Sequence, residues 1–177
     1  NYLNIFGLLL SMKIVIIVGT RPNFMKAAPL IYEFKKHNIE NVLVHTGQHY
    51  DFSMSKLFFD ELRLPKPDEH LVAGANAEVK NPKEFLKITI TEALKRHNPD
   101  LVIVVGDVNS TVAGAEAAHE LGIKVAHVEA GLRSFDSSMP EENNRIRTDQ
   151  ISDFMFTTEK SGNINLQKEG ITKDKIF

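Results

Sequence analysis

Cysteine is absent from the 177 residues of the sequence. The chain can therefore form no disulfide and offer no thiolate nucleophile, and we expect the protein in a reducing, cytoplasmic location. An excess of positive charge is missing as well, because 21 Lys and Arg residues stand against 23 Asp and Glu residues, for a net charge of −2. Without a broad positive field, we expect no nucleic-acid partner.

Two glycine-based phosphate motifs are also missing. No G-x-G occurs, which argues against NAD binding by the usual glycine turn, and no G-x-x-x-x-G-K-[ST] occurs, which excludes a nucleotide-triphosphate loop. The histidines other than His49 show no spacing typical of paired metal ligands. We therefore assign no metal and expect no cofactor.

A long uninterrupted apolar run is lacking even near the N-terminus. The stretch YLNIFGLLLSMKIVIIVG is apolar overall, but Lys13 splits it and no basic region precedes it. We therefore expect neither a signal peptide nor a membrane partner. The domain is expected to start at Met12, which leaves residues 1–11 as an extension of open origin; the alternative is a membrane- or partner-binding segment.

Apolar β-branched runs alternate along the chain with helix-like stretches. Runs that are apolar on both faces are typical of parallel strands covered by helices on each side. The expected strands are residues 13–18, 41–46, 101–105, 124–128 and 154–158. The expected helices are residues 24–37, 53–62, 84–97, 110–121, 141–151 and 159–169. This order predicts an α/β fold, a doubly wound three-layer αβα sandwich.

Four polar turns follow the expected strands. In a doubly wound sheet the carboxyl ends of the strands lie along one edge, where ligands bind, so these turns are expected to share one cleft. The turns read GTRPNFMK (19–26), GQHYDFS (47–53), GDVNST (106–111) and EAGLRSFDSSMPEENNR (129–145).

The first two turns contribute candidate substrate-binding residues. Arg21 and Lys26 flank the start of a helix and could hold a phosphate or a sugar carboxylate. The alternative is that Pro22 shapes the turn and both cations are solvated. In the second turn, Gln48 and His49 are candidates, although a lone loop histidine more often makes structural hydrogen bonds.

The third turn places Asp107 just past a buried strand. Its carboxylate is either another helix cap, like the Asn, Ser and Thr residues that follow it, or a reactive group. The helix behind it is rich in Ala and contains Gly114, which predicts close packing against the sheet.

The fourth turn is the most heavily charged. Glu129 directly follows a strand, where its side chain would point into the cleft, and Arg133 lies four residues further on. Glu141 and Arg145 are also four residues apart and share one helix face. The structural alternative is a capping box from Ser138 to Glu141, with a surface Glu141–Arg145 pair worth only about 0.3–0.5 kcal/mol.

Taken together, these turns resemble one family. The segments VGTRPNFMKAAPL, HTGQHYD, VVGDVNST, HVEAGLRSFDSSMPEENNR and DFMFTTEKSGNINLQKEGI are similar, in order and spacing, to the N-terminal half of non-hydrolysing UDP-N-acetylglucosamine 2-epimerases. The resemblance implies that residues 12–177 form a Rossmann-like domain, the first half of a two-domain GT-B enzyme whose second, UDP-binding domain is missing here. It also implies a UDP-sugar substrate. Apart from the resemblance, the expected helices 53–62 and 84–97 offer apolar faces that could pair in a homodimer.

The family interconverts UDP-GlcNAc and UDP-ManNAc without NAD, by eliminating UDP to leave 2-acetamidoglucal and then adding it back. By position, Asp107, Glu129 and Glu141 match its catalytic carboxylates. Lys26 and Arg145 join them as catalytic cations. Arg21 matches a first-loop cation of the family and Arg133 lies in its EAGLR motif. With Gln48 and His49 from the second turn, they are the candidate substrate-binding residues.

The sequence also departs from the family pattern. The second-strand turn lacks the Gln-x-x-Gln-Met pattern of members that are activated by substrate, and it looks similar to relatives that act on UDP-2,3-diacetamido-glucuronate. The alternatives are therefore an epimerase of that sugar, a hydrolysing UDP-GlcNAc 2-epimerase, and a non-catalytic sugar-nucleotide-binding module. For the chain alone we expect little or no epimerisation.

Overall fold

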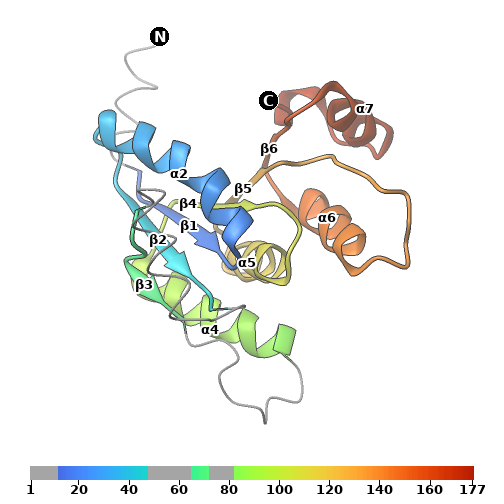
Figure 1. The fold of residues 1–177 in the computed structure, drawn as a ribbon. Helices are drawn as coiled ribbons and strands as arrows, with labels where there is room; N and C mark the ends of the chain where they lie inside the picture. Colours follow the sequence, from blue (N-terminus) through green and yellow to red (C-terminus); the bar gives the residue numbers. More distant parts are fainter. Residues whose placement is uncertain (1–11, 48–64, 72–81) are drawn as a thin grey trace.

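The protein was analysed as a computed structural model that describes residues 12–47, 65–71 and 82–177. Within these residues one sheet is formed, with strand order β3-β2-β1-β4-β5-β6, and all its neighbours are parallel (Figure 1). The strands are β1 (Ile14–Val18), β2 (Asn41–His45), β3 (Glu69–His70), β4 (Leu101–Val105), β5 (Lys124–Val128) and β6 (Phe154–Phe156). The helices are α2 (Arg21–Lys36), α4 (Pro82–His97), α5 (Asn109–Glu120), α6 (Pro140–Ile151) and α7 (Lys160–Lys168), with a 3-10 turn at Lys173–Lys175.

The predicted α/β fold is confirmed, with corrections at several element ends. Helix α2 begins at Arg21 rather than at residue 24, because Pro22 suits a first helical turn and Asn23 accepts a hydrogen bond from the Thr20 N–H at 3.1 Å. Strand β6 is shorter than predicted and ends at Phe156. The short strand β3 and the 3-10 turn were not anticipated, and the predicted helix 53–62 lies outside the described residues.

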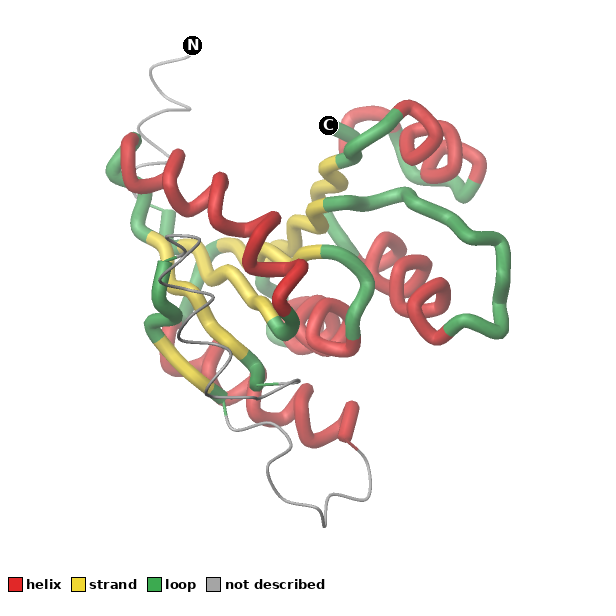
Figure 2. The backbone as a smooth tube through the Cα atoms, in the orientation of Figure 1, coloured by secondary structure: helices red, strands yellow, loops and turns green. Residues whose placement is uncertain are grey.

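Helices cover both faces of the sheet. Helix α2 packs on one face, whereas α4, α5 and α6 pack on the other (Figures 1 and 2). Strand β1 shows why: Ile14, Ile16 and Val18 face α2, while Val15 and Ile17 face α4 and α5. Burial of both faces explains why these strands read as continuous apolar runs instead of alternating with polar residues. A smaller cluster of Ala130, Met155 and Leu166 packs α7 beside β6.

Close helix–sheet contact at α5 was also predicted, from its small residues. A Cβ atom added to Gly114 would lie 2.8 Å from Ile17 Cδ1 and 3.1 Å from Val104 Cγ1. Only glycine therefore lets α5 approach β1 and β4 this closely, and the start of α5 is held against the edge of the sheet.

The order of the strands determines where a ligand would bind. Strand β1 lies between β2 and β4, so the chain leaves β1 toward β2 and later returns to β4 on its other side. Such a switch point opens a crevice outside the carboxyl ends of the two strands. The turns that begin at Gly19 and Gly106 lie at this point.

No helix among the described residues is long and apolar enough to cross a membrane.

Candidate active site

The turns after β1, β4 and β5 converge at the switch point. Asn23 connects two of them, because its side chain accepts a hydrogen bond from the Gly19 N–H at 3.1 Å and donates one to the Val105 carbonyl at 3.0 Å. A Cβ atom placed on Gly106 would lie 3.7 Å from Glu129 Oε2 and 3.9 Å from Lys26 Nζ. Gly106 thus lies directly beneath side chains from two other turns.

Lys26 and Glu129 form an ion pair across this point. Their side chains are 40% and 22% exposed, so both remain open to a ligand. Glu129 has φ 73°, a left-handed conformation that a residue with a Cβ rarely adopts. The N–H groups of Glu129 and Ala130 both donate to the Phe156 carbonyl, at 2.9 and 3.0 Å, and this double contact holds the strained turn. Strain of this kind in a half-exposed acid is typical of functional sites.

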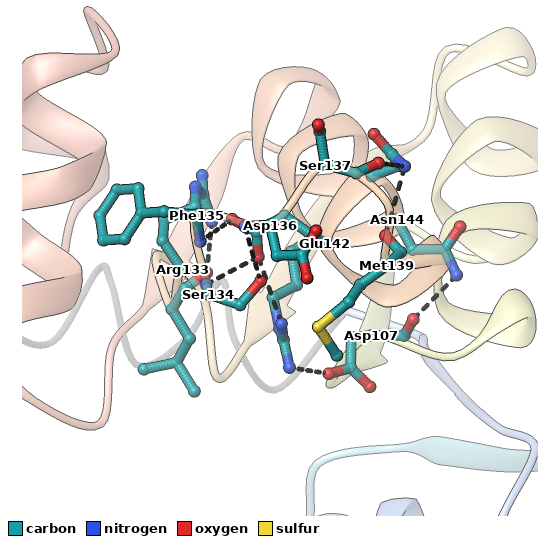
Figure 3. Close-up of polar contacts among 12 residues, drawn as sticks. Asp107, Arg133, Ser134, Phe135, Asp136, Ser137, Met139, Glu142 and Asn144 are labelled. Carbon is teal, nitrogen blue, oxygen red and sulfur yellow. Dashed lines mark hydrogen bonds and ion pairs between the residues drawn. The ribbon is translucent and has the colours of Figure 1, made fainter.

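A second ion pair lies next to the first. Arg145, from α6, pairs with the carboxylate of Asp107 and donates to Glu142 Oε2 at 3.3 Å. Asn144 donates to the Asp107 backbone carbonyl at 2.9 Å, which holds the turn from behind (Figure 3). Asp107 is 27% exposed and Arg145 20%, so this pair is also accessible.

The two neighbouring acids at the start of α6 have different surroundings. Glu142 is buried and accepts hydrogen bonds from the N–H groups of Ser134 and Phe135, both at 3.0 Å (Figure 3). Burial raises the pKa of Glu142, but these N–H groups, the Ser134 side chain and Arg145 outweigh that effect, so the pKa lies below its ordinary value. Glu141 is exposed, and its side chain makes no hydrogen bond or ion pair with any residue in the described part of the chain.

The structural alternative, a capping box from Ser138 to Glu141, is wrong. Helix α6 begins at Pro140 with Met139 as its cap residue, and no side-chain cap bond forms. The Ser138 hydroxyl donates instead to Asp136 Oδ1 at 2.6 Å. The Glu141–Arg145 surface pair of the same alternative does not form either, because the guanidinium of Arg145 reaches the sheet edge and not the solvent face of the helix.

Arg133, a predicted substrate-binding residue, is not part of this cluster. Its side chain is 1% exposed and is held by Glu169 through contacts of 2.8 and 2.6 Å and by Asp149 at 2.8 Å. A further guanidinium N–H donates to the Leu132 carbonyl at 2.7 Å. Because the guanidinium is buried and held by these acceptors, the structure gives Arg133 a supporting position.

Of the remaining predicted residues, one lies at the edge of the site and two lie outside the residues that the structure describes. Arg21 is the first residue of α2 and is exposed, about 1.4 helical turns before Lys26. Gln48 and His49 lie outside the described residues. The turn that leads toward them is nevertheless fixed, because Thr46 Oγ1 lies 2.7 Å from Ser110 Oγ at the start of α5.

The arrangement can perform proton transfer on a polar ligand. Asp107 and Glu129 each offer a half-exposed carboxylate beside a cation, which suits a group that must hold or release a proton during a reaction. Lys26, Arg145 and Arg21 offer positive charge to an anionic leaving group. No group of three or more His, Cys, Asp or Glu side chains that could hold a metal ion occurs within residues 12–47, 65–71 and 82–177.

Sequence reasoning missed three residues that support the site. Asn23, His127 and Asp149 are all buried polar side chains, 3%, 0% and 0% exposed. His127 lies among Val125, Ala126 and Val128 in strand β5, and Asp149 lies on the face of α6 that turns toward that strand. A polar residue inside an apolar run was the available signal, because such a residue needs a buried partner.

Comparison with known proteins gives a consistent result. Residues 32–177 match the sequence model of the family described as UDP-N-acetylglucosamine 2-epimerase. A UDP-N-acetylglucosamine 2-epimerase homolog of Methanococcus maripaludis is 54% identical over 160 residues, which are 90% of this chain and 44% of the relative. A UDP-2,3-diacetamido-2,3-dideoxy-D-glucuronate 2-epimerase of Pseudomonas aeruginosa is 42% identical over 163 residues, which are 92% of this chain and 46% of the relative.

Solved structures agree with this match. The UDP-GlcNAc 2-epimerase of Methanocaldococcus jannaschii, in complex with UDP-GlcNAc and UDP, superposes with a TM-score of 0.87 at 46% identity, over 94% of this chain and 46% of that one. The chain therefore spans about half the length of the relatives it matches. This agrees with the predicted first half of a GT-B enzyme.

Proposed function

Because the chain belongs to the UDP-N-acetylglucosamine 2-epimerase family, we propose that the complete protein interconverts UDP-GlcNAc and UDP-ManNAc. The observation that carries the proposal is the meeting of two half-exposed carboxylates, Asp107 and Glu129, with the cations Arg145 and Lys26 at the switch point of the sheet. The UDP-GlcNAc complex of the M. jannaschii enzyme, which has the same fold, supports this choice of substrate class.

The proposed reaction is an elimination followed by an addition. A base takes the proton from C2 while the C1–O bond breaks and UDP leaves with the bonding electrons, which gives 2-acetamidoglucal. A proton then returns to the opposite face of C2, and UDP attacks C1 again. Positive charge develops at C1 as its bond to oxygen breaks, and a nearby carboxylate stabilises it. Acid and base groups are needed on both sides of the ring, because the proton leaves from one face and returns to the other.

The roles follow from position in the cluster. Asp107 and Glu129 handle the C2 proton, and each carboxylate is paired with a cation. Glu141, exposed on the first turn of α6, and Arg145 steady the charged sugar. Lys26 and Arg21 attract the diphosphate from the first turns of α2, and Gln48 and His49 complete the sugar contacts.

Replacement of Asp107 tests this assignment. In the complete protein, Asp107→Asn keeps an oxygen near Arg145 but removes the base, so we expect exchange of the C2 hydrogen with deuterium oxide and turnover to fall by about 10²- to 10⁴-fold. Asp136→Asn is the matched control and should keep wild-type exchange. Asp136 is an exposed acid, and among the described residues its carboxylate bonds only Ser138 in its own loop. Undiminished exchange in Asp107→Asn would remove Asp107 from the mechanism.

A second candidate substrate is UDP-2,3-diacetamido-glucuronate, supported by the P. aeruginosa relative. The chemistry at C2 is the same, but this sugar carries an additional carboxylate, for which Arg21 is a suitable cation. The complete protein offered both sugars should epimerise one at a much higher kcat/KM. If Arg21→Ala lowers kcat/KM for the glucuronate selectively, that substrate is favoured. Release of free sugar in place of a UDP-sugar epimer would favour the hydrolysing reaction.

The proposed partners are the remaining UDP-binding domain and a second copy of the protein. Helix α4 buries Leu86, Ile90 and Leu94 against the sheet and leaves Ile88 53% exposed on its outer face. Such a face can contribute to a homodimer. The other helix suggested for this contact, residues 53–62, lies outside the described part of the chain.

A further inference from the structure

A chain of buried charged side chains runs beneath the active-site turns. It starts at the surface with Glu169, which holds Arg133, and continues through an Arg133–Asp149 contact of 2.8 Å. Asp149 Oδ1 lies 2.6 Å from His127 Nδ1, and His127 Nε2 lies 2.8 Å from the carbonyl oxygen of Gly106. Arg133, Asp149 and His127 are each no more than 1% exposed, so water does not reach these contacts.

The partners of His127 determine its protonation. The Gly106 carbonyl can only accept, so Nε2 must carry a hydrogen. On the other side, the proton of the pair belongs either to Nδ1 or to Asp149. Asp149 Oδ2 already receives the Gly131 N–H at 3.1 Å and the Arg133 guanidinium at 2.8 Å, and both favour the ionised carboxylate. The proton therefore lies on Nδ1, and both ring nitrogens donate.

We propose that His127 is held as a buried imidazolium, and that this cation positions the Gly106 carbonyl and the attached Asp107 turn for catalysis. Arg133 and His127 supply two positive charges and Asp149 and Glu169 supply two negative ones, so the buried set is balanced. Burial raises the pKa of Asp149, but the hydrogen bond and charge of His127 and the charge of Arg133 outweigh it, and the pKa lies below its ordinary value. His127, Arg133 and Asp149 are positioning residues, because none of them faces the ligand.

The positioning matters because of what Gly106 adjoins. Gly106 has φ +72°, lies beneath Lys26 and Glu129, and precedes Asp107 directly. Its peptide carbonyl is held by His127, and the next carbonyl, that of Asp107, is held by Asn144. Asp149 also receives the Gly131 N–H, two residues after Glu129. A single buried ion pair thus fixes the backbone under both carboxylates that are proposed to move the C2 proton.

NMR of the complete protein with ¹⁵N-labelled histidine tests the protonation directly. Both nitrogens of His127 should show bound hydrogens and imidazolium ¹⁵N shifts. In Asp149→Asn the carboxylate is removed, and His127 should change to a neutral ring that keeps its hydrogen on Nε2. A neutral ring in the wild-type protein overturns the proposal. The wild-type spectrum gives this answer even if the variant fails to fold.

Kinetics test the positioning role, and this arm rests on the proposed function. His127→Gln can still donate to the Gly106 carbonyl but carries no charge, and we expect kcat to fall about 100-fold while KM changes less than about threefold. Asp153→Asn is the matched control, because Asp153 also holds β5, through Lys124 and the Val125 N–H at 3.0 Å, but at the opposite end of the strand. The control should keep wild-type kcat.

The two proposals fail in different ways. If neither UDP-sugar is epimerised by the wild-type protein, the proposed function fails while the NMR result still decides the state of His127. If the wild-type protein is active and His127→Gln keeps its kcat, the positioning role is overturned and the proposed function stands.

Discussion

Adjacent acids at the start of α6 illustrate how one residue position decides a role. Glu141 and Glu142 follow Pro140 in the first turn, and successive helical residues point about 100° apart. Glu142 therefore turns inward, where it receives two backbone N–H groups of the preceding loop, while Glu141 remains in solvent. Glu142 anchors the loop, whereas Glu141 is available to contact a substrate.

This division predicts that matched substitutions of the two acids affect different properties, stability for Glu142 and turnover for Glu141. Glu142→Gln places an amide NH₂ against one of two buried N–H donors, so the free energy of unfolding should fall by about 1–3 kcal/mol. Glu141→Gln should change it by less than about 0.5 kcal/mol, yet lower turnover if Glu141 contacts the sugar. Urea titrations together with initial rates measure both. Equal stability of the two variants would mean that Glu142 does not anchor the loop.

Single residues were the least predictable part of the site. Lys26, Asp107, Glu129 and Arg145 were expected at one sheet edge, and the structure brings them together there. Their positions follow from strand ends, which apolar runs reveal. The burial of Arg133 could not be foreseen, because it depends on Glu169 and Asp149, which lie 36 and 16 residues further along the chain. Side-chain pairing of this kind is a tertiary property that local spacing does not encode.

At the scale of elements, the turn after β5 depends on a contact with α7. Gly131 has φ +77°, and a Cβ atom there would lie 2.5 Å from the Gly162 carbonyl oxygen in the first turn of that helix. The Asn165 side chain donates to the Gly131 carbonyl at 2.9 Å and fastens the same contact. Helix α7 thus supports the turn that carries Glu129.

Alanine substitutions at two glycines separate the cost of the Gly131–α7 contact from the cost of a left-handed backbone conformation. Gly122, at the end of α5, has φ +71° but open space around its missing side chain. Gly122→Ala should therefore cost only the left-handed conformation, about 1–2 kcal/mol. Gly131→Ala carries the same backbone cost and must also displace α7, so its free energy of unfolding should fall by clearly more. Similar values for the two variants in urea unfolding would contradict a tight turn–helix contact.

Elements were more predictable than side chains, because their signals are local. Strands β4 and β5 have the predicted bounds, since each is a short apolar run between polar turns. The start of α2 was misplaced because Pro22 was interpreted as part of a turn, whereas proline is also favoured in the first turn of a helix. The two-residue strand β3 carries no apolar run, and it forms only because it pairs with β2.

At the scale of the whole molecule, stability should depend on pH through a buried histidine at the sheet edge. His45 is 4% exposed, packs against the Phe24 ring at 5.0 Å, and places Nδ1 3.2 Å from Nδ1 of His70. Burial, and then the neighbouring His70, lower the pKa of His45 from 6.5 to about 4. The native protein therefore keeps His45 neutral near pH 5, where the unfolded chain would bind a proton.

The sign of the effect follows from this difference in proton binding. Between pH 6.5 and pH 4 the unfolded state holds more protons at His45 than the native state does, so acidification favours unfolding. From pH 7 to pH 4.5 the contribution of His45 should fall by about 2 kcal/mol. His45→Gln removes this titration while keeping a polar side chain of similar length, and the other ionisable groups are shared. Urea titrations at the two pH values should therefore show a smaller loss in the variant, and an equal loss in both proteins would show that His45 is not held neutral by the fold.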